Sequence, residues 1–185
     1  MKKAVLISLR PTWCELIARA INPVMYSIIK KVEVRKTRPK LETPFKVYIY
    51  CTKDKKNTFF PPLTQKLLNE SPKDFVIDRR GNGKVIGEFI CNEITVAERG
   101  NYCVLKKSET LIDELDLLEY ADGKTVYGWH ISDLVIYDKP KELSEFSRHD
   151  DTYDNAFGWA FEDRAKSTPI KRPPQSWCYV EELGA

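Results

Sequence analysis

The residues best suited to chemistry form a basic stretch near the N-terminus. Residues 30–38 read Lys-Lys-Val-Glu-Val-Arg-Lys-Thr-Arg, which places five cations and one carboxylate in nine positions. If this stretch is a strand, Lys31, Glu33 and Arg35 share one face. Lys30, Val32, Val34 and Lys36 share the other face, which the two valines tie to the core. The pattern predicts a charged patch that holds an anionic or hydrogen-bonding ligand. The alternative is an edge strand whose cations protect it from aggregation.

A second pattern is the uneven distribution of charge along the chain. Residues 1–56 hold 14 Lys and Arg against 4 Asp and Glu, whereas residues 57–185 hold 16 against 23. Such asymmetry indicates one basic face for a polyanion, unless the fold brings the acidic half beside the basic half. Single-stranded nucleic acid requires cations for its phosphates and flat side chains for its bases. The candidate binding residues are Arg10, Trp13, Lys30, Lys31, Glu33, Arg35, Lys36 and Arg38.

Composition restricts the class of protein. The 185 residues suit one domain spanning 1–185, and no apolar run is long enough to cross a membrane. The five cysteines are odd in number and form no C-x-x-C pair, which favours reduced, buried thiols in a cytoplasmic protein. The chain has no Walker loop, nucleophile elbow or dinucleotide fingerprint, so we expect no cofactor and no metal.

Most of the predicted elements are strands. Their β-branched and aromatic content predicts strands over Ala4–Leu9, 30–38, Phe45–Cys51, Val85–Thr95, Trp129–Asp138 and Ser176–Glu181. Gly87 inside one of them suggests a bulge or a close backbone approach. The pattern predicts an α+β, mainly β fold: an antiparallel β-barrel of about six strands with a few attached helices.

Two helices and two surface insertions complete this prediction. Thr12 and Glu15 form a capping-box pattern at the start of a first helix, which ends at Asn22-Pro23. A second, amphipathic helix is predicted over Glu109–Tyr120, with its apolar side buried and Asp122-Gly123 at its end. The buried side of that helix would consist of Leu111, Ile112, Leu115 and Leu118. We expect the insertions around 53–75 and 147–170.

Three stretches together resemble the ASCH domain family of the PUA-like superfamily. They are Ser-Leu-Arg-Pro-Thr-Trp at 8–13, the basic stretch from Lys30, and Gly-Lys-Val-Ile-Gly-Glu-Phe at 83–89. The ending Arg-Pro-Pro-Gln-Ser-Trp-Cys-Tyr at 172–179 is similar to the last strand of small bacterial and phage-borne members. In the family pattern G-x-K-x-x-E-x-R, Lys30, Glu33 and Arg35 match, whereas Ile28 replaces the glycine. Residues 21–29 look like an insertion.

The resemblance implies a PUA-like barrel with a cleft between the first helix and the basic strand. Members of the family are thought to bind RNA or modified nucleosides. One branch resembles small amidohydrolases that act on acylated cytidine with a lysine, a threonine and a glutamate, and another has been linked to RNA cleavage. By this match Lys30 takes the lysine position, Glu33 stands where that branch has threonine, and Glu88 is the candidate for the second carboxylate.

The leading hypothesis is a cytoplasmic RNA-binding module that recognises a modified nucleotide in a cleft beside residues 30–38. One alternative is a nucleoside amidohydrolase or ribonuclease with Lys30, Glu33 and Glu88 as catalytic residues, because burial and pairing shift their pKa values. The missing threonine removes the hydroxyl nucleophile of that branch, which favours an ion pair that orders the wall of the cleft over catalysis. A further alternative is a protein-interaction module, such as a phage product that binds a host factor through the acidic, aromatic loop at 150–163.

Overall fold

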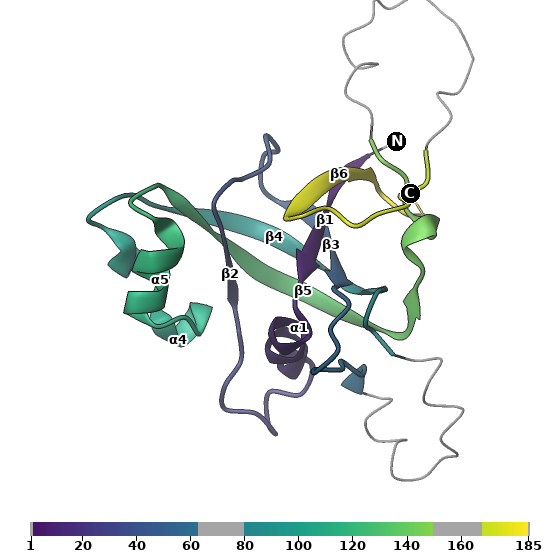
Figure 1. Ribbon diagram of the computed structural model, residues 1–185, viewed down its shortest axis with the longest axis horizontal. Coiled ribbons are helices and arrows are strands. Elements are labelled where there is room, and N and C mark those ends of the chain that lie inside the picture. The colour runs from purple at the N-terminus through teal and green to yellow at the C-terminus, as the bar shows by residue number, and fades with distance from the viewer. Residues whose placement is uncertain (1, 63–79, 150–167, 185) are drawn as a thin grey trace, which may run out of the picture.

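Six β-strands form one mixed sheet in the computed structural model, which describes residues 2–62, 80–149 and 168–184 (Figure 1). The strands are β1 (Lys3–Leu9), β2 (Val32–Arg35), β3 (Phe45–Cys51), β4 (Val85–Ala97), β5 (Val126–Lys141) and β6 (Trp177–Glu181). Their order is β2-β5-β4-β3-β1-β6, and every recorded pair is antiparallel except β1 with β3. The predicted mainly β fold is confirmed.

The neighbouring strands β1 and β3 are buried on both faces except at Lys3 and Lys46, as a parallel pair covered on both sides requires. Val47 and Ile49 belong to the core cluster that includes α1 residues, whereas Tyr48 lies on the other face with Phe146. The face to which a strand residue points therefore decides whether its side chain packs on the α1 side of the sheet or on the Phe146 side.

Helix α1 (Pro11–Ala18) packs on one face of the sheet and continues into the 3-10 turn η1 (Arg19–Ile21). The predicted capping box is wrong. Arg10 occupies the N-cap position, its side chain makes no cap hydrogen bond, and Pro11 begins the helix. Proline suits this first position because its fixed backbone angle is helical and the amide that it lacks would have no partner there. The helical stretch ends at Asn22, as predicted.

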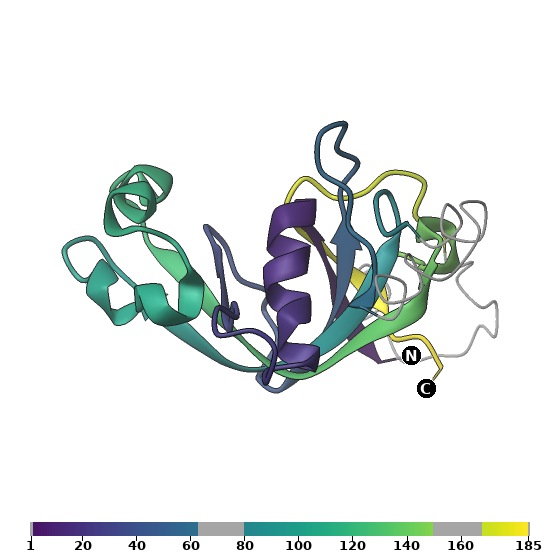
Figure 2. The same ribbon diagram turned by 90° about the horizontal axis from the view of Figure 1, so that it is seen from below.

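Strands β4 and β5 extend beyond β3 as a long arm, which β2 joins by pairing with residues 127–130 of β5. The end of the arm carries η2 (Tyr102–Val104), α4 (Lys107–Thr110) and α5 (Glu114–Ala121) (Figure 2). The single helix predicted over Glu109–Tyr120 is therefore wrong. Leu111 has a left-handed backbone (φ 57°) that ends α4. Leu115 is 79% exposed and Leu118 is 44% exposed, and Leu117 is buried in their place.

The curvature of the sheet brings its two edge strands together. Arg35, at the end of β2, donates a 2.7 Å hydrogen bond to the carbonyl of Ser8 in β1. The Trp177 indole in β6 donates a 2.9 Å hydrogen bond to Thr37 Oγ1, just beyond β2. Within the described residues, side chains rather than a ladder of backbone hydrogen bonds join β2 to the β1–β6 edge.

The predicted close approach at Gly87 is confirmed. A Cβ atom at this position would lie 2.2 Å from the Val135 carbonyl oxygen of β5. The β4–β5 register shifts between Val85 and Gly87, as expected at a bulge.

Several predictions fall on parts of the chain that the structure does not describe. Residues 63–79 and 150–167 contain most of both predicted insertions and the whole loop at 150–163. The 3-10 turn η3 (Leu143–Glu145) comes shortly before the second of these segments. Of the helices in the described parts, none combines the length and apolar character needed to cross a membrane.

Candidate functional site

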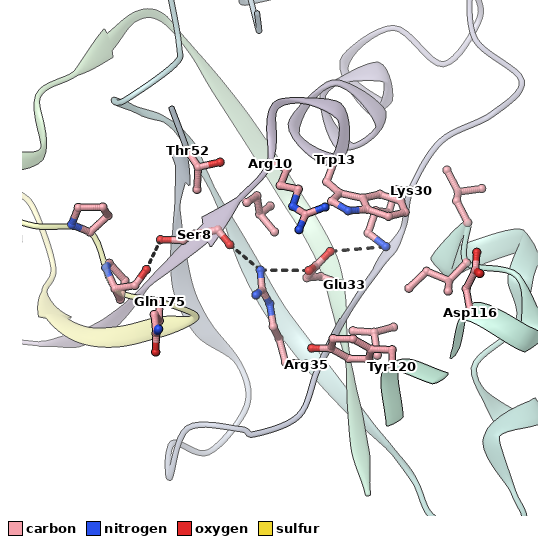
Figure 3. Close-up of a pocket in the computed structure, with 16 residues that line it drawn as sticks. Ser8, Arg10, Trp13, Lys30, Glu33, Arg35, Thr52, Asp116, Tyr120 and Gln175 are labelled. Atoms are coloured by element: carbon pink, nitrogen blue, oxygen red, sulfur yellow. Dashed lines mark hydrogen bonds and ion pairs between the residues drawn. The ribbon is translucent and has the colours of Figure 1, made fainter. Parts of the chain in front are cut away.

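A cavity of about 730 Å³ opens beside β2, between α1 and the helices at the end of the arm. Arg10 and Trp13 line it from the start of α1, and Asp116 and Tyr120 line it from α5 (Figure 3). A third wall comes from residues 173–175, just before β6. The cavity is thus assembled from segments far apart in the sequence, at the place where the edge strands approach each other.

Three charged residues from the basic stretch lie together in this cavity. The Lys30 ammonium lies 3.5 Å from Glu33 Oε2, and the Arg35 guanidinium lies 3.2 Å from Glu33 Oε1. Side-chain exposures are only 1% for Lys30, 8% for Glu33 and 12% for Arg35. We call these three residues the buried ion group.

The Lys30 side chain is held by contacts on several sides. Its ammonium donates a 2.5 Å hydrogen bond to the Thr110 carbonyl and lies 4.5 Å from the centre of the Trp13 ring. Burial lowers the pKa of Lys30 from 10.5, and the neighbouring Glu33 carboxylate opposes this shift. Lys30 and Glu33 were predicted to point to opposite faces, and this prediction is wrong. Lys30 precedes β2, and its backbone N–H bonds to the Leu16 carbonyl, so strand alternation does not extend to it.

Arg35 links the ion group to two other walls of the cavity. Besides Glu33 it contacts the Ser8 carbonyl, and the Ser8 hydroxyl in turn donates a 2.7 Å hydrogen bond to the Pro174 carbonyl. This chain of contacts fixes the segment 173–175 against β1 and β2. The wall on this side is therefore preorganised.

Aromatic side chains come from two different helices. Trp13 belongs to α1 and Tyr120 to α5, and in the view of Figure 3 Glu33 lies between them. Burial raises the pKa of the Tyr120 hydroxyl, which is therefore neutral at physiological pH. The Lys36 ammonium lies 5.0 Å from the centre of the Tyr120 ring, which places Lys36 at the rim. Flat rings beside hydrogen-bonding groups suit a planar ligand.

The structure brings most of the predicted binding residues to one place. Arg10, Trp13 and the three members of the buried ion group all line the cavity. Lys31 and Arg38 are exposed and do not line it. The expected position of Lys31 beside Glu33 is wrong: its backbone N–H bonds to the Glu109 carbonyl, and Lys30 is the residue that pairs with Glu33.

Glu88 lies elsewhere and does not join Lys30 and Glu33. It stands opposite Tyr48 in the β3–β4 ladder, accepts a 2.5 Å hydrogen bond from the Tyr137 hydroxyl, and pairs with Lys46 at 3.1 Å. Tyr48 faces the core cluster on the side of the sheet away from α1. A catalytic group of Lys30, Glu33 and Glu88 is therefore not formed.

Sequence reasoning missed several residues that line the cavity. Ser8, Thr52, Asp116, Tyr120 and Gln175 contribute to its walls. Ser8 and Gln175 do fall inside stretches that resemble the ASCH pattern, which was a usable signal. For Asp116 and Tyr120 the sequence offers none, because their place depends on how the arm folds back towards α1. Thr52 follows β3, and its place depends on the pairing of β3 with β1.

No family model matches the chain, and no curated protein matches it. Among solved structures, ASCH from Zymomonas mobilis is 16% identical, with a TM-score of 0.55 over 97% of this chain and 88% of that one. Two mutant forms of ZmASCH both give a TM-score of 0.56. The first mutant form is 16% identical and covers 98% of this chain and 92% of its own. The second is 17% identical and covers 97% of this chain and 89% of its own. These similarities show that the chain has an ASCH-like fold.

Proposed function

We propose that the cavity binds single-stranded RNA by accepting one unpaired nucleotide. The observation that carries this proposal is the buried ion group, which opens into a cavity of about 730 Å³ beside Trp13. That volume is within the usual range of small-ligand pockets. The ASCH-like fold supports a function related to nucleic acids.

The arrangement assigns different tasks to the rim and to the interior. Arg10 and Lys36 are exposed at the rim, where cations can meet phosphates. Glu33 lies inside, and each of its oxygens is engaged by one cation. A carboxylate has about four acceptor positions, so Glu33 retains acceptors for the N–H donors of a base edge.

The experiment is a binding titration with a fluorescent single-stranded RNA at several salt concentrations. Affinity should fall as salt rises, because phosphate contacts release counterions. Exchanging Arg10 and Lys36 together for Ala should weaken binding and reduce the salt slope by about 1.4, or about 0.7 for each lost contact.

The matched control removes two exposed cations that do not line the cavity, Arg99 and Lys139. This double variant has the same net charge as the first one. No binding at low salt, or equal losses in both double variants, would contradict a site in the cavity.

A hydrolytic function of the same cavity is the second candidate. It rests on Lys30, whose lowered pKa and carboxylate neighbour are typical of groups that transfer protons. Turnover of RNA, or of an acylated cytidine, should be lost in Lys30→Met, which keeps the apolar stem and removes the amine. Activity that survives this change would exclude Lys30 from the mechanism.

A further inference from the structure

A cluster of exposed cations follows the end of β3. Residues 53–56 read Lys-Asp-Lys-Lys, and all four are exposed. Within the described residues, none of these three lysines forms an ion pair with a carboxylate. We call residues 53–56 the basic loop. Their ammonium groups are therefore available to an anionic partner.

The one carboxylate of the basic loop is engaged by the loop itself. Asp54 accepts a 2.7 Å hydrogen bond from the backbone N–H of Lys56. It accepts two more from Asn57, at 3.3 Å from the backbone N–H and at 3.2 Å from the side-chain amide. The hydrogen bond from Lys56 is the main cause that lowers the pKa of Asp54, and those from Asn57 act in the same direction. Asp54 thus shapes the turn and leaves the three lysines to an outside partner.

The basic loop is also fixed to the turn that precedes β4. The Asn82 side chain accepts a 2.8 Å hydrogen bond from the Phe59 N–H and donates one of 2.8 Å to the Asn57 carbonyl. The stem of Lys53 lies on Gly83, where a Cβ atom would come within 3.0 Å of Lys53 Cε. A loop held in this way loses little freedom when a ligand binds.

The basic loop begins at the rim of the cavity. Strands β1 and β3 run parallel with Leu9 opposite Cys51, so both strands end at the same edge of the sheet. The Thr52 N–H donates a 2.8 Å hydrogen bond to the Leu9 carbonyl. The residues that follow the two strands, Arg10 and Thr52, both line the cavity (Figure 3). The cations of the loop therefore continue from Arg10 away from the cavity.

We propose that the basic loop binds phosphates of the RNA strand that leaves the cavity on the Arg10 side. This inference rests on the proposed function and extends it from one nucleotide to a path. In Figure 3, Arg10 and Tyr120 lie on opposite sides of Glu33, and Lys36 lies beside Tyr120. The strand passes from Lys36 across the cavity to Arg10 and then along the basic loop. Cations that follow the backbone add affinity without base preference.

The test is a binding titration of the full chain with single-stranded RNAs of about three and about twelve nucleotides. The short RNA fills the cavity and its rim, whereas the long one also reaches the basic loop. Exchanging Lys53, Lys55 and Lys56 together for Ala should weaken binding of the long RNA by about tenfold or more at low salt, and should reduce its salt slope by about 2. The short RNA should bind this lysine variant as tightly as the wild type.

Two further triple variants serve as controls. Exchanging the same three lysines for Arg keeps the charge and should keep the affinity for the long RNA. Exchanging Arg99, Lys106 and Lys124 for Ala removes the same charge from exposed positions at the end of the arm. This arm variant should bind the long RNA as the wild type does. Circular dichroism of each variant confirms that it is folded.

The outcomes separate this inference from the proposed function. If the long RNA binds the wild type no more tightly than the short one, the path over the basic loop is overturned and the nucleotide site in the cavity stands. The same holds if the lysine variant loses no more affinity than the arm variant. If neither RNA binds the wild type at low salt, the proposed function itself fails and this inference falls with it.

Discussion

Lys30 is the residue on which the candidate site depends most. Burying an ammonium group is costly unless charges and hydrogen bonds replace its water. Here Glu33, the Thr110 carbonyl and the face of Trp13 take that role. These contacts also join β2, α4 and α1, so the side chain fixes the distance between three walls of the cavity.

The lowered pKa of Lys30 leads to a prediction about stability and pH. At pH values between the lowered pKa of Lys30 in the folded chain and its ordinary pKa of 10.5, the unfolded chain still holds the Lys30 proton. The folded chain has released it. The free energy of unfolding of the wild type, relative to Lys30→Met, should therefore rise with pH across this window. Below the window the difference should be constant. Urea unfolding of both proteins from neutral pH to about 10.5 measures it, and a flat or falling difference would contradict the assignment.

At the same scale, the sequence predicted Glu33, Arg35, Lys30, Trp13 and Arg10 as residues of one binding site, and all five line the cavity. The motif spacing carried this information, because all five fall within two short stretches that resemble the ASCH pattern. Glu88 was misplaced because strand alternation was not applied to β4. Phe89 and Cys91 are buried in the core cluster that includes α1 residues, which leaves Glu88 on the other side of the strand, opposite Tyr48.

At the scale of elements, the strands were more predictable than the helices of the arm. Continuous β-branched and aromatic runs indicate buried strands whatever their partners, and β1, β3 and β6 match their predicted ranges closely. Periodicity alone could not reveal that Leu111 adopts a left-handed backbone and splits the predicted helix. Nor could it show that Leu115 and Leu118 remain exposed, because their exposure depends on which side of α5 meets the arm.

The end of α5 supplies a prediction for this scale. Asp122 has a left-handed backbone (φ 52°), and its carboxylate lies at the negative end of the helix dipole. Glycine adopts this backbone without strain and removes the charge, so Asp122→Gly should stabilise the protein by about 1 kcal/mol. Glu119→Gly, inside the same helix and exposed, should instead cost about 1 kcal/mol. Urea unfolding measures both, and destabilisation by Asp122→Gly would refute this view of the helix end.

At the scale of the whole molecule, the cavity exists because the sheet curves until its edges meet. Arg35 and Trp177 bridge β2 to the β1–β6 edge. The arm carries α5 to the same side of the sheet as α1, as Figure 2 shows. No local sequence pattern encodes this closure, which explains why Tyr120 and Asp116 could not be predicted as parts of the site.

The most direct test of the central claim is the nucleotide preference of the wild type and of Glu33→Gln. Single-stranded homopolymers of each base are titrated at one salt concentration, below the unfolding temperature of both proteins. Because Glu33 accepts N–H donors from the bound base in this account, the wild type should prefer some bases over others, and the variant should lose that preference. Its salt slope should stay unchanged, since Arg10 and Lys36 still meet the phosphates. An unaltered base preference in folded Glu33→Gln would contradict the account.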